Sequence, residues 1–239
     1  MLPVTTKSGT SVGSKIIGTP TLGLRGLRLW LTFNEGSGST AYDYSFYNNH
    51  CTLNGPIWTN GKFGKCIYLD GIDDYGDCGK SHSLDFTDAI TIAVWFYSED
   101  FSTERPLVSK WDYWGNKGYG ITLFSDKYEV RLFNGVDRSN TLVYNEAPPV
   151  NTWTFIAATY QKDGDMKLYI NGELKASQAG TGSIANPDLP LCIGKAADSD
   201  YLWWKGMIDE IKLYARVLSD YEIQLLYYNR IGAVPSKTI

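Results

Sequence analysis

Short apolar runs separated by turn-rich segments recur along most of the chain. Residues 90–97 (ITIAVWFY) and 153–160 (WTFIAATY) are continuous apolar runs, which predict strands that are covered on both faces. The pair Asn171-Gly172 between two further runs predicts a hairpin with a type I′ turn. Short strands at regular spacing, with almost no helix, indicate an all-β fold, an antiparallel β-sandwich or jelly roll. The other predicted strands are residues 26–33, 51–53, 66–69, 75–78, 106–110, 119–124, 128–133, 167–170, 173–176, 191–193 and 208–214.

The last predicted strand leads directly into one short helix. Residues 204–214 (WKGMIDEIKLY) are apolar at alternating positions near their end, but the adjacent acids Asp209 and Glu210 interrupt the pattern. Two carboxylates at the start of a core strand are costly unless other groups compensate them. Ser219 and Glu222 then fit a capping box, and apolar residues at helical spacing follow them. We therefore expect a closing strand that carries two acids and ends in a short C-terminal helix.

Length and charge narrow the class of protein. A chain of 239 residues suits one sandwich-sized domain, and its net charge of −4 without a basic run argues against nucleic acid as a partner. No apolar stretch is long enough to cross a membrane, which argues against membrane insertion. Residues 1–23 lack the unbroken apolar segment of a signal peptide, so we interpret them as a linker or the edge of a neighbouring domain. The expected domain spans residues 24–232, with a short tail over 233–239.

The four cysteines leave two interpretations open. They are Cys51, Cys66, Cys78 and Cys192, and no CxxC pair suggests zinc or redox chemistry. If the turn-rich stretch 70–74 closes a hairpin, Cys66 and Cys78 lie nearly opposite each other and can form a cross-strand disulfide. The alternative is two small buried thiols. The number of cysteines alone does not decide the compartment.

Six short motifs occur along the chain in a fixed order. They are Leu27-x-Leu29-Trp30-x-x-Phe33-x-Glu35-Gly36-x-Gly38, Tyr42-Asp43-x-Ser45 with Asn48-Asn49, Gly61-Lys62-Phe63-Gly64-Lys65, Leu69-Asp70-Gly71-x-Asp73-Asp74-Tyr75, Tyr169-Ile170-Asn171-Gly172, and Gly206-x-Ile208-Asp209-Glu210-Ile211-x-Leu213-Tyr214-x-Arg216-x-Leu218-Ser219. Together they resemble the landmarks of LamG-like jelly-roll domains (laminin G type 3-like), in the concanavalin A-like lectin/glucanase superfamily. The chain departs from that pattern at Phe46 and Tyr47, where the family usually has glycines. A shared fold supports many activities, so the resemblance implies fold more strongly than function.

The resemblance also implies a structural calcium ion between the loop over residues 42–50 and the last strand. Calcium prefers several hard oxygen ligands, which this polar loop can supply. The implied ligands are Asp43, Asp209, a backbone carbonyl near Asn48, and Asn49, with Glu35 as a further ligand or an outer-shell group. The alternative is that Asp43 and Asn48 make Asx-turns, while Asp209 pairs with Arg216 or caps backbone amides.

Two loops rich in aromatic residues suggest a carbohydrate-binding surface. Trp111, Tyr113 and Trp114 lie in one of these loops, and Tyr201 and Trp203 lie in the loop before the last strand. Flat aromatic faces for stacking, together with Asp and Asn side chains for hydroxyl groups, are the chemistry that holds a sugar. The alternative for each tryptophan is burial, because a buried indole contributes far more to stability than an exposed one. We expect Trp111, Trp114 and Trp203 at the surface and Trp204 in the core.

The sequence does not favour catalysis. Glucanases of the superfamily that this chain resembles carry Glu-x-Asp-x-x-Glu along one strand, so that the acids share a face. No such run occurs here, and the adjacent Asp209 and Glu210 should point to opposite faces of their strand. No Gly-x-Ser-x-Gly motif or phosphate-binding loop is present. We therefore expect a protein that is not an enzyme.

These observations suggest an extracellular or surface recognition module that binds a carbohydrate or glycoprotein and carries a structural calcium ion. The expected location is extracellular, on a cell surface or on a virion, next to other domains of a longer chain or within a homo-oligomer. The alternative function is a structural domain that assembles a surface layer, an appendage or a virion and has no sugar site. A glycan array combined with a measurement of oligomeric state distinguishes the two.

Overall fold

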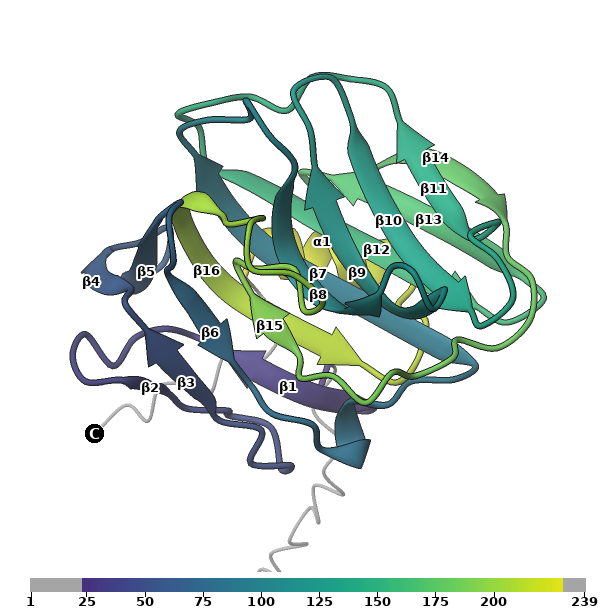
Figure 1. The fold of residues 1–239 in the computed structure, drawn as a ribbon, viewed down its shortest axis with the longest axis horizontal. Helices are drawn as coiled ribbons and strands as arrows, with labels where there is room; N and C mark the ends of the chain where they lie inside the picture. The colour runs from purple at the N-terminus through teal and green to yellow at the C-terminus, as the bar shows by residue number, and fades with distance from the viewer. Residues whose placement is uncertain (1–22, 230–239) are drawn as a thin grey trace, which may run out of the picture.

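The computed structural model describes residues 23–229, which form two antiparallel sheets packed face to face (Figure 1). Sheet A runs in the order β14 (Glu173–Ala179), β13 (Asp165–Ile170), β12 (Thr154–Gln161), β7 (Ala89–Ser98), β16 (Lys205–Tyr214), β5 (Lys65–Asp70) and β4 (Ile57–Asn60), and β1 (Leu27–Leu31) also pairs with β16. Sheet B runs in the order β11 (Thr141–Tyr144), β10 (Tyr128–Asn134), β9 (Lys117–Leu123), β8 (Arg105–Asp112), β15 (Cys192–Ile193), β6 (Tyr75–Asp77), β3 (Cys51–Asn54) and β2 (Thr40–Ala41). The short helices are η1 (His82–Leu84) and α1 (Asp220–Tyr227). This architecture confirms the predicted all-β jelly roll with one C-terminal helix.

The main core lies between the two sheets and follows from the alternation of side chains along each strand. In β10, Val130 and Leu132 face inward and are fully buried in the main apolar cluster. Their neighbours Glu129 and Arg131 lie on the outer face of sheet B, because successive strand residues point to opposite sides. The outer face of sheet B therefore carries charged side chains, and these belong to the site described below.

Helix α1 covers the outer face of sheet A, which explains the continuous apolar runs of β7 and β12 (Figure 1). Trp95 of β7 and Phe155 of β12 point away from the main core and pack in a second cluster with Ile223 of the helix. Tyr227 stacks on Trp95 with ring centroids 5.5 Å apart. The predicted capping box is present, so the helix begins at the expected place. Strands that are buried on both faces need apolar residues at every position, as the sequence indicated.

The predicted hairpin and most of the predicted strands are confirmed. Asn171 and Gly172 have positive φ angles of 51° and 82°, as a type I′ turn between β13 and β14 requires. Three strands were not predicted: β2, β4 and β11. Each is a short strand at or near a sheet edge, and β4 leaves its end residues exposed, so none carries a long apolar run. The expected N-terminal linker and C-terminal tail fall almost entirely outside the described residues.

Strand β16 contains a bulge that allows it to pair with two different strands along one edge. Its first half, up to Ile208, pairs with β5, and its second half, from Ile211, pairs with β1. The register against β7 shifts between Asp209 and Lys212, and Glu210 has a positive φ of 50°. The extra residue returns both isoleucines to the main core although they lie three positions apart. The interruption by two acids therefore marks a bulge.

The two acids of the bulge have separate partners. Asp209 is completely buried, and its Oδ2 accepts a hydrogen bond of 2.9 Å from the amide of Phe63 in the turn between β4 and β5. Gly61 in this turn permits the approach, because a Cβ there would lie 2.7 Å from the same oxygen. The Glu210 carboxylate instead accepts from the indole of Trp30 and pairs with Lys212. Asp209 thus caps a backbone amide, one of the two roles that were open as alternatives to calcium binding.

The suggested disulfide between Cys66 and Cys78 is wrong. Cys66 lies in β5, which pairs with strands of sheet A, whereas β6, directly before Cys78, pairs with strands of sheet B. Residues 70–74 therefore cross from one sheet to the other and do not close a hairpin. Cys78 forms its disulfide with Cys51, and Cys66 and Cys192 are free, buried thiols. Burial raises the pKa of the Cys66 thiol to about 12, so it stays protonated at neutral pH.

The expectation that Trp111 lies at the surface is also wrong. Its indole is 1% exposed and lies on the outer face of sheet B in a small cluster with Phe133 and Ala196. Gly120 of the neighbouring strand makes room for it, because a side chain there would occupy the position of the ring. The residues around Trp111 have the composition of a loop, but Trp111 itself lies in strand β8 and packs against sheet B.

Burial of Trp111 predicts a large loss of stability on truncation. Trp111→Ala should lower the free energy of unfolding by about 3–5 kcal/mol, the cost of removing a buried aromatic side chain. Trp114→Ala is the matched control, since Trp114 lies in the turn that directly follows the same strand but is 80% exposed. The control should change the free energy of unfolding by no more than about 0.5 kcal/mol. Urea unfolding measures both, and equal effects would contradict the assignment of Trp111 to the core.

Burial of Asp209 predicts a specific dependence of stability on pH. Desolvation raises the pKa of its carboxyl from 3.8 to about 7, against the opposing hydrogen bond from Phe63. Between about pH 4 and pH 7 the unfolded chain has lost this proton while the folded chain keeps it, so stability falls as the pH rises. The loss, on the order of a few kcal/mol, should level off above about pH 7 and be absent in Asp209→Asn. Urea unfolding of both proteins in EDTA across this range tests it, and parallel curves would contradict the prediction.

Candidate functional site

A cleft of about 440 Å³ lies on the outer face of sheet B, between two loops that are far apart in sequence. One loop is the turn between β8 and β9, which supplies Tyr113 and Trp114, and the other is the segment before β16, which supplies Asp198 and Tyr201. The amide of Tyr113 donates a hydrogen bond of 2.7 Å to the Asp198 carboxylate and so ties the loops together. The structure therefore unites residues from both of the aromatic loops that the sequence singled out.

The rim of the cleft carries exposed aromatic side chains. Trp114 is 80% exposed and Tyr201 is 74% exposed, although both are large rings that normally contribute stability by burial. Tyr113 is half-buried, and the guanidinium of Arg138 lies over its ring at 3.7 Å from the centroid. The buried Trp111 lies beneath them as part of the lining. Exposed rings above a fixed base are an arrangement that can stack against a flat ligand.

Trp203 does not belong to this cleft. Its ring packs against Tyr75 with centroids 5.8 Å apart, and the ammonium group of Lys195 lies over both rings at 4.8 and 5.0 Å. The side chain is half-buried. Because Trp203 and Trp204 are successive residues, the core position of Trp204 directs Trp203 away from the main core. The prediction that Trp203 shares one surface with Trp111 and Trp114 is therefore not supported by its position.

Charged side chains complete the cleft, and sequence reasoning missed them. Arg131 of β10 is 5% exposed, and its guanidinium donates to Glu129 at 2.9 and 3.2 Å and to Glu104 at 2.6 Å. Lys127 forms a second ion pair with Glu129 at 2.8 Å. The alternation of Lys127, Glu129 and Arg131 along β10 and its preceding turn was the only signal for this group in the sequence. Such a pattern is equally typical of a solvated strand face.

The first of the residues predicted to bind calcium, Asp43, is engaged in hydrogen bonds within its own loop. Both oxygens of the Asp43 carboxylate accept hydrogen bonds, from the amide of Trp30, the amide and hydroxyl of Ser45 and the amide of Asn49, at 2.6–2.9 Å. The Asn49 side chain donates to the carbonyl of Arg28 and accepts from Ser83. Asp43 thus holds its loop together as an Asx-turn carboxylate, and a cation would have to displace these donors.

The remaining predicted ligands are only partly engaged, because Oε2 of Glu35 and Oδ1 of Asp209 are buried without a hydrogen-bond partner. Glu35 accepts from the amide of Tyr42, Asn48 is exposed with a positive φ of 54°, and Asp209 caps the β4–β5 turn. Within residues 23–229, three ligand atoms of acidic, histidine or cysteine side chains come within 4.8 Å of one another at Asp70, Asp73 and Asp74 instead. Calcium at the loop around Asp43 would have to compete with these hydrogen bonds, and it stays a prediction.

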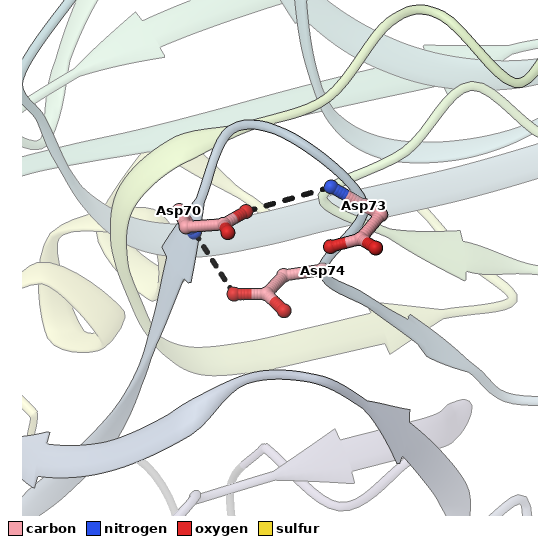
Figure 2. A group of neighbouring side chains, drawn as sticks. All are labelled: Asp70, Asp73 and Asp74. Carbon is pink, nitrogen blue, oxygen red and sulfur yellow. Dashed lines mark hydrogen bonds between the residues drawn. The ribbon is translucent and has the colours of Figure 1, made fainter.

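Figure 2 shows these three aspartates at the turn between β5 and β6. Asp74 is largely buried and accepts a hydrogen bond of 2.9 Å from the amide of Asp70, whose own carboxylate accepts from the amides of Ile72 and Asp73. Burial, with the charges of the other two carboxylates, raises the pKa of Asp74. These hydrogen bonds account for the shape of the crossing between the sheets, and we assign no ion to the group.

The loop around Asp43 presents a second aromatic surface that sequence reasoning treated only as a metal loop. Asp43, Ser45 and Asn49 point inward, which turns the residues between them outward. The exposed members are Tyr42, Tyr44, Phe46 and Tyr47, with Phe46 85% exposed. The guanidinium of Arg28 lies over the Tyr47 ring, 4.4 Å from its centroid, and this surface serves below as the control for the cleft.

Comparison with solved structures agrees with this architecture. The binding domain of Paraclostridial Mosquitocidal Protein 1 superposes with a TM-score of 0.68 at 21% identity, over 85% of this chain and 52% of that chain. The binding domain of Botulinum Neurotoxin serotype G gives a TM-score of 0.68 at 16% identity, over 85% and 51%. Domain 4 of AbnA, a GH43 extracellular arabinanase from Geobacillus stearothermophilus solved in complex with arabinotriose, gives 0.63 at 19% identity, over 84% and 98%. At these identities the likeness shows the fold alone.

A curated relative is similar in sequence over part of the chain. It is the human Adhesion G-protein coupled receptor D1, 26% identical over 144 residues, which are 57% of this chain and 16% of the receptor. The chain thus spans a small fraction of that relative and about half of the toxin domains. Within residues 23–229, no helix is long and apolar enough to span a membrane.

The family model Laminin_G_3, described as the concanavalin A-like lectin/glucanases superfamily, matches residues 70–224, which is more than half of the chain. The match includes both loops of the cleft and the bulged strand β16. Two antiparallel sheets, the C-terminal helix and the similar binding domains agree with it. The protein belongs to the Laminin_G_3 family and has the lectin-like fold that these binding domains share.

Proposed function

We propose that the protein is a non-catalytic recognition module that binds a carbohydrate in the cleft on the outer face of sheet B. The observation that carries the proposal is the pair of exposed rings, Trp114 and Tyr201, on two loops that meet over a charged and aromatic base. Ligand sites typically combine apolar walls with a few convergent polar groups. The cleft has both, in a family whose fold occurs in an arabinanase domain solved with arabinotriose.

The chemistry of the cleft suits a sugar. The faces of the Trp114 and Tyr201 rings can pack against the C–H groups of a sugar ring, and burial of those groups supplies affinity. Carboxylate oxygens of Glu104, Glu129 and Asp198 can accept hydrogen bonds from hydroxyl groups, which fixes orientation. The amide of Tyr113 holds Asp198 in place, so part of the site is organised before a ligand binds.

The proposal excludes glycoside hydrolysis. A glycosidase needs one carboxyl group that can donate a proton and a second carboxylate across the scissile bond. In the cleft, the carboxylates of Glu104 and Glu129 both accept hydrogen bonds from Arg131, so these groups are already engaged inside the protein. The expected measurement is that the protein releases no more reducing sugar from the oligosaccharides it binds than a heat-inactivated sample.

The proposed location is extracellular or on a surface. The disulfide between Cys51 and Cys78 supports an oxidising compartment, since such bonds persist mainly outside the cytosol. Relatives and structural neighbours include an adhesion receptor, an extracellular arabinanase domain and toxin binding domains. The alternative assembly function has no separate observation in its favour, and a stable oligomer that binds no glycan would support it.

Truncation of the exposed rings tests the carbohydrate site. Trp114→Ala and Tyr201→Ala should each weaken binding to a glycan selected on an array by about 1–3 kcal/mol, as expected for loss of an aromatic contact. Both variants should keep the melting temperature of the wild type because the rings are exposed. Isothermal titration calorimetry with that glycan measures the change.

Phe46→Ala is the matched control, because Phe46 is an equally exposed aromatic residue on the separate loop around Asp43. It should bind the selected glycan as the wild type does. A loss of binding in Phe46→Ala with full binding in Trp114→Ala would move the site to that loop. Absence of any binding partner on the array would contradict the carbohydrate proposal.

Calcium remains a separate prediction, supported by the family resemblance and opposed by the hydrogen bonds at Asp43. An ion bound only by the folded state stabilises it by about 2.7 kcal/mol at a hundredfold excess over Kd. EDTA should then lower the melting temperature by several degrees, at about 2–4 °C per kcal/mol. Calcium should restore it better than magnesium, which requires a tighter octahedral site.

Two variants locate the ion. Asp43→Asn should abolish the shift with EDTA if the ion binds at the loop over residues 42–50, and Asp74→Asn should abolish it if the ion binds at the turn shown in Figure 2. A wild-type protein that contains no metal by elemental analysis and whose melting temperature is insensitive to EDTA would contradict calcium at both places.

A further inference from the structure

Arg131 is a cation whose charge is fully engaged inside the protein. Its guanidinium lies over the rings of Trp111, Tyr113 and Phe124, at 5.0, 5.1 and 5.9 Å from their centroids. Glu129 and Glu104 accept hydrogen bonds from all three of its nitrogens. A planar guanidinium is the group best suited to bind a carboxylate through two parallel hydrogen bonds. Here two carboxylates of the protein already occupy that position.

Both cations that line the cleft are engaged in ion pairs, while Arg138, which stacks on Tyr113 at the rim, lies outside this lining and donates to Asn116. The lining contains two cations, Lys127 and Arg131, and both pair with Glu129. It contains three carboxylates, from Glu104, Glu129 and Asp198. An acidic sugar would therefore meet a surplus of negative charge. It could reach Arg131 only by displacing a glutamate that is itself mostly buried, which costs more than an exposed pair would.

A binding site can reject a ligand through unfavourable contacts, such as repelling or unpaired charges. We propose that the cleft selects uncharged glycans, and that the pairing of Arg131 with Glu104 and Glu129 is the feature that excludes glycans bearing carboxylates. The inference rests on the proposed carbohydrate function and names the class of sugar that this function takes. Arg131 acts as a specificity-determining residue through its glutamates: with one of them neutralised, the same guanidinium becomes available to a uronate.

Glu104→Gln tests the inference directly. Glu104 lies in the loop before β8, with its side chain 18% exposed, and glutamine keeps its shape while removing its charge. The probes are immobilised oligomers of galactose and of glucose, each with its uronate counterpart, galacturonate and glucuronate. Each pair of probes differs mainly in a carboxylate at the same ring position. Surface plasmon resonance gives the ratio of affinities for the neutral and the acidic probe.

The wild type should bind a neutral oligomer at least about tenfold more tightly than its uronate counterpart. Glu104→Gln should reduce this preference by about tenfold or more, mainly through tighter binding of the uronate. Glu173→Gln is the control, because Glu173 is an exposed acid of β14 that pairs with Lys175, and it also removes one negative charge. The control should keep the wild-type preference. Glu129→Gln serves as the second test if the melting temperature shows that Glu104→Gln does not fold.

The outcomes separate the inference from the proposed function. Wild-type binding of a uronate as tight as that of its neutral counterpart overturns the inference and leaves the carbohydrate function standing. An equal change in Glu104→Gln and Glu173→Gln overturns it too, because net charge would then account for the preference. If no probe and no glycan of the array binds, both the proposed function and the inference fail.

Discussion

The bulge in β16 is the constraint on which the rest of the sandwich depends. This strand pairs with β7 along one edge, and with β5 and then β1 along the other, so it connects three parts of sheet A. The change of partner needs a local break in register, which places Glu210 in a backbone conformation that non-glycine residues rarely adopt. The hydrogen bond from Phe63 to Asp209 and the ion pair of Glu210 with Lys212 offset the cost of that break.

The same strand also positions the cleft. The loop that carries Asp198 and Tyr201 ends at Trp204, which is completely buried immediately before β16. The amide of Trp204 donates to the carbonyl of Gly194 at 2.7 Å, which closes the loop at its base. Because one end of the loop is anchored in the core, its tip can present an exposed tyrosine against the β8–β9 turn without losing its place. The buried Trp204 therefore helps to hold the exposed residues of this loop in a fixed position.

Charge in the cleft is best understood as a closed network and not as a set of independent side chains. Arg131 stacks on aromatic rings that also form the base of the cleft, and its glutamates come from β10 and from the loop before β8. A buried pair of this kind contributes little net stability, but removal of one partner leaves an uncompensated charge. In the inference above, the same network decides which ligands can enter the cleft.

The sequence by itself determined the jelly roll, because apolar runs, the Asn171-Gly172 turn and the capping box at Ser219 are local signals whose meaning does not depend on distant residues. It also showed that Asp209 and Glu210 interrupt the last strand, but only the pairing of that strand with β5, β1 and β7 identified the interruption as a bulge. Only the tertiary structure decided which residues meet. Cys78 pairs with Cys51 and not with Cys66 because the chain crosses between sheets at residues 70–74. Trp111 is buried because the pairing of strands in sheet B covers its ring. Arg131 is paired with Glu104 because the fold brings together two residues that lie 27 positions apart in the sequence.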